Sequence, residues 1–150
     1  MNSQGFVQLP EGAVVAFQEY GVPNGVPVMF CHGWPSSCTM ARLTDEPARD
    51  LGIRIISLDR PGISGSSLQP DRKLSDWPRV VERIVEHLGV CEFRVLAISG
   101  GAPYALGNSS ASTSTLRVTA SCASAVHAVM SNPKTHKLKT AREKFCIARP

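Results

Sequence analysis

The chain has 150 residues, of which 43% are apolar and 19% charged, and it carries a net charge of +4. This is the size and composition of one soluble domain with an ordinary core, and it argues against wholesale disorder. No run of 18 apolar residues occurs, and the start of the chain is polar and mixed, so we expect no secretory signal. We therefore expect a cytoplasmic protein.

The positive charge is confined to the last third of the chain. Residues 1–100 hold nine Lys or Arg and eleven Asp or Glu, whereas residues 101–150 hold seven Lys or Arg and one acid, Glu143. The basic tail has almost no aromatic residue that could stack on a base, only Phe145. We expect a solvated tail, with no nucleic-acid and no membrane partner.

The cysteines predict reduced thiols. Five occur, an odd number, and none has C-x-x-C spacing. Cys31 and Cys91 lie in or beside apolar runs, as small buried thiols do. No Walker A pattern and no dinucleotide fingerprint is present, so we expect no cofactor and no metal.

Up to residue 106 the sequence alternates strand and helix signals. Two strands flank a hairpin turn at Pro10-Glu11-Gly12, and three mostly apolar strands come later. In chain order the strands are expected at residues 6–9, 13–19, 27–31, 53–58 and 93–98. Strands with little polar alternation, separated by helices, indicate a mostly parallel sheet covered on both faces. The sequence therefore predicts a three-layer α/β/α fold.

Helices are expected between these strands. Residues 47–51 form a short helix that tolerates Pro47 in its first turn. The clearest helix is capped by Ser75 or Asp76, has apolar residues at helical spacing, and stops at Gly89. A further helix begins at about Ala102.

After Leu106 this regularity fades. Nine of the eighteen residues 107–124 are Ser or Thr. A weak strand at 116–123 and a weak helical segment at 123–130 are the only signals before the basic tail. We predict two regions, an ordered half domain at 1–106 and a divergent, partly disordered tail at 107–150.

Three loops contain residues that could carry out chemistry, and each of them follows a predicted strand. The third, Ala97-Ile98-Ser99-Gly100-Gly101, is close to the G-x-S-x-G nucleophile elbow, with Ala97 in place of the first glycine. A serine lifted on a sharp strand-to-helix turn needs small neighbours two residues away on each side. The following helix directs its N-terminal N–H groups toward Ser99, where negative charge would develop. The other two loops are His32-Gly33-Trp34-Pro35 and the segment 59–66, Asp-Arg-Pro-Gly-Ile-Ser-Gly-Ser.

The order of these three motifs resembles the N-terminal half of the α/β-hydrolase family over residues 6–106. The resemblance implies Ser99 as the nucleophile, with backbone N–H groups of Trp34 and Gly100 forming the oxyanion hole. It implies that four further motif residues shape the loops and the pocket floor: His32, Gly33, Asp59 and Gly62. Serine at the elbow disfavours the epoxide-hydrolase and dehalogenase branches. Esterase, lipase, lactonase and aminopeptidase-like branches remain.

The sequence departs from the family in the other two members of the triad. In this fold the order is Ser, then Asp or Glu, then His. After Ser99 the only acid is Glu143, and it follows both downstream histidines, His127 and His136. We identify no triad acid or base and expect weak or absent hydrolysis. A chain cut short after the nucleophile helix would explain this pattern.

Two functions therefore stay open. The first is a serine hydrolase acting on a small acyl substrate, with an unusual base such as His127. The second is a non-catalytic, hydrolase-like protein that binds a small ligand or a partner. In either case the strand at 93–98 must end the sheet or pair with 116–123, so self-association through an exposed sheet edge is expected.

Overall fold

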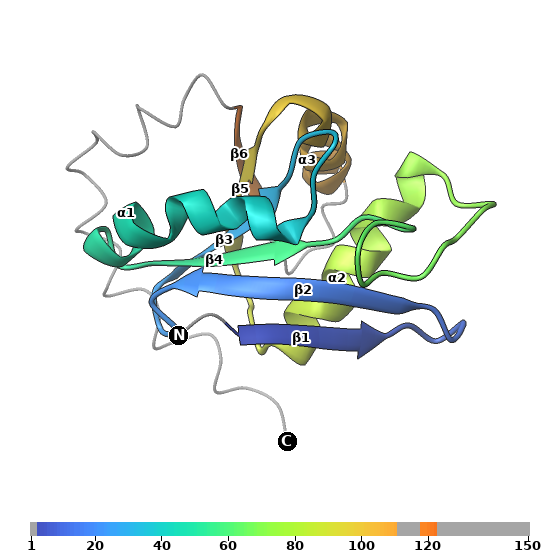
Figure 1. Cartoon of the computed structure of the whole chain (residues 1–150), viewed down its shortest axis with the longest axis horizontal. Helices are drawn as coiled ribbons and strands as arrows, with labels where there is room; N and C mark the ends of the chain where they lie inside the picture. Colours follow the sequence, from blue (N-terminus) through green and yellow to red (C-terminus); the bar gives the residue numbers. More distant parts are fainter. Residues whose placement is uncertain (1–2, 111–117, 123–150) are drawn as a thin grey trace.

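The protein folds as a mixed sheet with helices on both faces, in a computed structural model that describes residues 3–110 and 118–122 (Figure 1). In chain order its elements are β1 (Ser3–Gln8), β2 (Val14–Gly21), β3 (Val26–Cys31), the 3-10 helix η1 (Cys38–Thr44), α1 (Asp45–Asp50), β4 (Ile53–Leu58), the 3-10 helix η2 (Leu74–Asp76), α2 (Trp77–His87), β5 (Phe93–Ala97), the 3-10 helix η3 (Ser99–Gly101), α3 (Ala102–Ser110) and β6 (Val118–Cys122).

The strands are arranged in the order β1-β2-β4-β3-β5-β6. β4, β3, β5 and β6 run parallel, while β2 pairs antiparallel with β4 and β1 antiparallel with β2. β3 is central, with Phe30 opposite Ser57 of β4 and Cys31 opposite Ala97 of β5. These three parallel strands therefore end at the same edge of the sheet, and the three motif loops leave from that edge. The expected mostly parallel sheet is confirmed.

Two cores lie on opposite faces of the sheet. Because side chains alternate along a strand, Met29 and Cys31 of β3 face one core and Val28 and Phe30 the other. The first core is closed by α2 and by Ala105 of α3. The second is closed by Ala41 of η1 and Ala48 of α1. The expected three-layer arrangement is confirmed.

The apolar face of α2 explains its position. Trp77, Val80, Val81, Ile84 and Val85 are all buried, as the helical spacing predicted. The helix ends before Gly89, which has a φ of +63° and so stops it as expected. Asp76 is the N-cap, but its carboxylate accepts a hydrogen bond from the Lys73 N–H (2.9 Å) and none from the helix itself.

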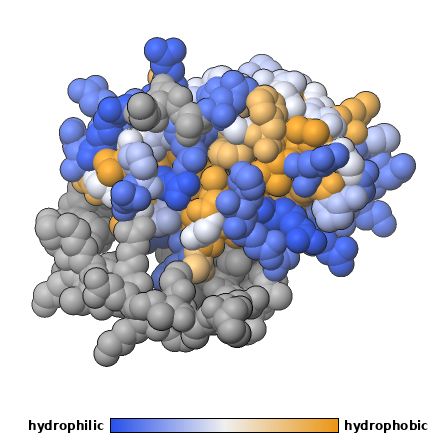
Figure 2. Space-filling view, turned by 90° about the horizontal axis from the view of Figure 1, so that it is seen from below, coloured by the Kyte–Doolittle hydropathy of each residue, from blue (hydrophilic) through white to orange (hydrophobic). Residues whose placement is uncertain are grey.

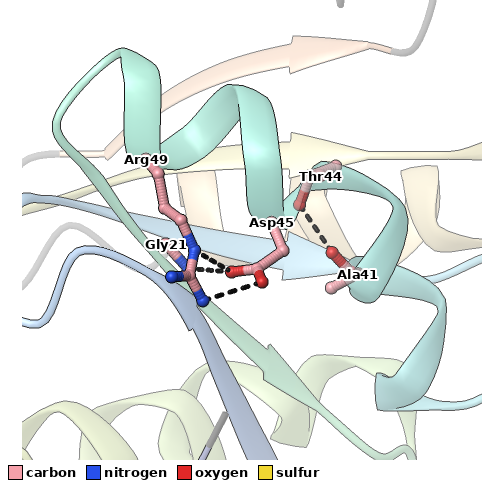
Figure 3. Close-up of polar contacts among 5 residues, drawn as sticks. All are labelled: Gly21, Ala41, Thr44, Asp45 and Arg49. Atoms are coloured by element: carbon pink, nitrogen blue, oxygen red, sulfur yellow. Dashed lines mark hydrogen bonds and ion pairs between the residues drawn. The ribbon is translucent and has the colours of Figure 1, made fainter. Parts of the chain in front are cut away.

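The helix α1 begins at Asp45, two residues before the predicted start, because Asp45 anchors it to the sheet (Figure 3). Its carboxylate accepts hydrogen bonds from the Gly21 N–H (2.8 Å) and from the Arg49 side chain, at 2.9 Å and 3.2 Å. The bond from Arg49 and then that from Gly21 lower the pKa of Asp45. Gly21 has a φ of +80°, which favours glycine at the end of β2.

Several boundaries differ from the predicted ones. β1 begins at Ser3 and ends at Gln8, β5 ends at Ala97, and the expected strand at 116–123 is β6, Val118–Cys122, paired with β5. The helical segment expected at 123–130 and the basic tail lie outside the described residues. The 3-10 helix η1 was not predicted at all.

The prediction for the cysteines is half wrong. Cys31 is buried, but Cys91 is exposed because it lies in the turn between α2 and β5. Cys38, in η1, is buried instead. Burial is the largest cause that raises the pKa of both Cys31 and Cys38 to about 12, so both thiols are unreactive at neutral pH.

β1 forms one edge of the sheet and is the lowest strand in Figure 1. Figure 2 views the molecule from below and shows apolar residues gathered on part of that face, between hydrophilic ones. Phe6, on β1, is 55% exposed. In the part of the chain that the structure describes, no helix is long and apolar enough to cross a membrane.

Candidate active site

The sharp turn after β5 holds Ser99 in a strained backbone conformation. Its φ is +48°, in the left-handed region that non-glycine residues rarely enter, and the residue is exposed. The 3-10 turn η3 starts at Ser99, and α3 follows directly from Ala102. An exposed serine between a strand and a helix, at positive φ, has the geometry of a nucleophile elbow.

The small residues around Ser99 are required by close packing. A Cβ built on Gly101 would lie 2.1 Å from the carbonyl oxygen of Cys31, so no larger residue fits there without movement. The Gly101 N–H donates to the carbonyl of Ile98 (2.9 Å), which closes the turn. Ala97, in place of the first glycine of the motif, is 1% exposed. The alanine is therefore accommodated in the core.

The loop after β3 lies directly against this turn. A Cβ built on Gly33 would lie 3.3 Å from the carbonyl oxygen of Ile98 and 3.5 Å from Cβ of Ser99. A Cβ built on Gly100 would lie 3.5 Å from the backbone nitrogen of Trp34. The structure thus brings together the two residues expected to donate N–H groups, Trp34 and Gly100, beside the expected nucleophile. The side chain of Trp34 is 70% exposed.

The loop 59–66 is held by the buried carboxylate of Asp59. Its two oxygens accept hydrogen bonds from the backbone N–H groups of Cys38 (2.6 Å) and Gly65 (3.3 Å). Asp59 is therefore committed to structural bonds within two loops. Gly62 has a φ of +74°, and Ser64 is the second non-glycine residue at positive φ, +49°. Gly62 turns the chain beside Leu68, and a Cβ built on Gly62 would lie 2.9 Å from Cδ1 of Leu68.

His32 is buried beneath the same loops. Its Nδ1 lies 3.0 Å from the carbonyl oxygen of Gly33 and 3.2 Å from Nη2 of Arg60. Burial, the largest cause, lowers the pKa of His32, and the Arg60 charge acts in the same direction. The imidazole is therefore neutral at pH 7. Its Nε2 is buried and has no hydrogen-bond partner among the described residues.

Arg60 was not predicted as a site residue, yet it joins two of the motif loops. Its Nη2 donates to the carbonyl of Gly33 (2.8 Å) and its Nη1 to the carbonyl of Gly100 (3.2 Å). The guanidinium also lies over the ring of Tyr104, 5.1 Å from the centroid. Tyr104 in turn meets Trp77 edge to face, with the ring centroids 5.1 Å apart. The only sequence signal was the position of Arg60 in the motif loop 59–66, two residues after the strand end.

Within residues 3–110 and 118–122 no histidine or carboxylate forms a hydrogen bond with Ser99. His87 is exposed on α2, and its ring centroid lies 6.3 Å from that of Phe17. His127, His136 and Glu143 lie outside the described residues. No group of three metal-binding side chains occurs in the described part of the chain.

A mixed sheet with helices on both faces, whose parallel strands end beside a strained strand-to-helix serine turn, is the architecture of a class of hydrolases. A sequence model described as "Alpha/beta hydrolase family" matches residues 28–148. The chain belongs to the alpha/beta hydrolase family.

Among known proteins, the proline iminopeptidase of Xanthomonas citri is 36% identical over 111 residues, which are 69% of this chain and 34% of the relative. An epoxide hydrolase from Vigna radiata has a similar fold, with a TM-score of 0.65, 18% identity, and coverage of 81% of this chain and 38% of that one. A hydrolase from Pseudomonas aeruginosa has a TM-score of 0.68 and 17% identity, with 77% and 44% covered. The chain therefore spans about a third of the curated relative's length and less than half of these solved structures.

Proposed function

We propose that Ser99 is the nucleophile of a serine acyl hydrolase and that the N–H groups of Trp34 and Gly100 form its oxyanion hole. The observation that carries this proposal is the positive φ of Ser99 at an exposed strand-to-helix turn. Backbone strain of this kind persists where surrounding packing enforces it, and it is concentrated at functional sites. Here the turn is closely packed, since a Cβ built on Gly101 would lie 2.1 Å from the carbonyl oxygen of Cys31.

The proposed reaction is acyl transfer. Ser99 Oγ attacks the carbonyl carbon of an ester or amide, and the oxyanion that forms accepts hydrogen bonds from the two N–H groups. The carbonyl C–O or C–N bond then breaks, and the leaving group takes a proton from water and departs as the alcohol or amine. A second water cleaves the acyl-serine ester, which releases the acid and restores the Ser99 hydroxyl. Since one relative of similar sequence is a proline iminopeptidase, an N-terminal prolyl amide is a substrate to test beside short-chain esters.

The activity of this 150-residue chain is proposed to be weak. No acid stands between Ser99 and a downstream histidine, so no residue pair is available in the order that the family uses. General-base help contributes about 10²–10⁴ in rate, while an oxyanion hole and binding alone leave about 10³–10⁴ over water. We expect the Ser99 hydroxyl to lose its proton to solvent base.

The missing base also supports a second function, binding of a small ligand without turnover. In that case the loops would select a ligand, and Ser99 would contribute a hydrogen bond rather than a covalent bond. Saturable binding of a substrate analogue, with no release of product, would favour this alternative.

The experiment compares Ser99→Ala with wild type. Purified protein is incubated with p-nitrophenyl acetate, and product release and the acylated peptide are measured by absorbance and mass spectrometry. Ser64→Ala is the matched control, because Ser64 is also exposed and also has a positive φ. We expect Ser99→Ala to lose acylation and Ser64→Ala to keep it. Equal acylation of wild type and Ser99→Ala would refute the assignment.

A further inference from the structure

Arg60 is a largely buried cation beside the proposed oxyanion hole. It is 9% exposed, and among residues 3–110 and 118–122 no carboxylate lies within ion-pair distance of its guanidinium. The neighbouring Asp59 directs its carboxylate at Cys38 and Gly65 instead. A buried charge without a counter-charge is costly, so a chain retains one where its hydrogen bonds or its field are used.

The hydrogen bonds of Arg60 end on the two segments that meet at Ser99. Nη2 binds the carbonyl oxygen of Gly33, and Nη1 binds the carbonyl oxygen of Gly100. The planar fork of a guanidinium fixes the spacing and direction of both acceptors at once. Arg60 thus holds the loop after β3 and the turn after β5 in one arrangement.

The bond to Gly33 reaches the proposed oxyanion hole through the peptide plane. The carbonyl of Gly33 and the N–H of Trp34 belong to the same peptide unit, which is planar. Fixing the carbonyl therefore fixes the direction of the N–H. A charged donor on the oxygen also polarises the peptide, which strengthens the hydrogen bond that its N–H can donate.

The peptide between Gly100 and Gly101 is held in the same way. Arg60 binds its oxygen, and its N–H donates to the carbonyl of Ile98. The guanidinium also lies over the ring of Tyr104 in α3, without a hydrogen bond to it among the described contacts. Each partner of Arg60 is therefore either part of the elbow and oxyanion loop or part of the helix that follows them.

We propose that Arg60 is a positioning residue of the oxyanion hole. Its guanidinium fixes the orientation of the Trp34 N–H relative to the elbow and places a positive charge next to both. The inference rests on the proposed function, in which Ser99 is acylated. It predicts that Arg60 acts on the rate of the covalent step rather than on the affinity for the reagent.

The test measures the labelling of Ser99 by an alkyl fluorophosphonate in the full chain. Intact mass gives the first-order rate constant at saturation and the half-saturating concentration. Removing a whole oxyanion donor costs about 10²–10³ in rate. Because Arg60→Met would misdirect one donor rather than delete it, we expect a loss of about 10- to 100-fold in the rate constant, with little change in half-saturation. Arg60→Lys, which can reach one carbonyl and keeps the charge, should recover part of the rate.

Tyr104→Leu is the matched control for packing, because it removes the ring under Arg60 and leaves both carbonyl bonds. We also expect the amide proton shift of Trp34 in NMR spectra to move in Arg60→Met and to stay in Tyr104→Leu. The inference is overturned if Ser99 is labelled at the wild-type rate in Arg60→Met. It is also overturned if Tyr104→Leu slows labelling as much as Arg60→Met does while the two variants have the same melting temperature. Labelling that persists in Ser99→Ala would instead refute the proposed function. In that case the Trp34 amide shift would still show whether Arg60 orients this N–H, so failure of the proposed function and failure of the inference can be told apart.

Discussion

Replacing Ser99 by glycine should make the protein more stable while abolishing its chemistry. Left-handed backbone costs an L-residue about 1–2 kcal/mol, and glycine enters it without that cost. Glycine also loses about 0.4–1 kcal/mol more conformational freedom on folding, which offsets part of the gain. With φ at +48° for Ser99, we expect a net stabilisation of about 1 kcal/mol. For a chain of this size that raises Tm by about 2–4 °C.

The assay is thermal unfolding of three variants followed by circular dichroism. Ser99→Ala keeps the Cβ and so keeps the strain, and because Ser99 is exposed its stability should stay within about 0.5 kcal/mol of wild type. Ser64 has a φ of +49°, so Ser64→Gly should gain as much stability as Ser99→Gly, while its Ser99 should still be labelled by the fluorophosphonate. If Ser99→Gly melts no higher than Ser99→Ala, the backbone strain assigned to the elbow is wrong.

Four further predictions concern the rest of the molecule. Gly101→Ala should destabilise by about 1–3 kcal/mol in urea unfolding, because its Cβ meets the Cys31 carbonyl at 2.1 Å, whereas Gly107→Ala, 3.8 Å from its nearest neighbour, should not. Asp45→Asn should lower the urea midpoint at pH 7; since the folded-state pKa of Asp45 is lowered, this difference is present above about pH 4 and is lost as the pH falls through the folded pKa. Iodoacetamide should modify exposed Cys91 well before Cys31, whose pKa of about 12 keeps it protonated even at pH 9; equal rates in peptide mapping would contradict the burial. We propose that the chain self-associates through an exposed sheet edge, so sedimentation at rising concentration should show an increasing mass, and a strict monomer would refute this.

The sequence predicted those parts of the fold that depend on local patterns. The apolar spacing in α2 and the stop at Gly89 lie within a few turns of one helix, so no distant contact was needed to read them. The elbow was readable from its five-residue motif at 97–101, although the contacts that require small residues there, such as that of Gly101 with the Cys31 carbonyl, come from distant parts of the chain. The sequence left open whether the strand at 93–98 ends the sheet or pairs with 116–123, and in the structure β6 pairs with β5.

The features that sequence analysis missed depend on residues far apart in the chain. The first N–H of η1, at Cys38, is held by the Asp59 carboxylate, 21 positions later. The helix α1 begins early because Asp45 binds the N–H of Gly21, 24 positions before it. The role of Arg60 requires carbonyl groups 27 and 40 positions away, and no periodicity records such bonds.

The two tryptophans of the chain give it separate optical reporters. Trp77 is 2% exposed and packs against Tyr104 in the core, so its emission follows the unfolding of the domain. Trp34 is 70% exposed and lies against Gly100, so a water-soluble quencher reaches it first. A molecule that occupies the space above Ser99 would shield Trp34 from the quencher and leave Trp77 unchanged. Occupancy and unfolding can therefore be measured in one cuvette, from the quenchable and unquenchable parts of the same spectrum.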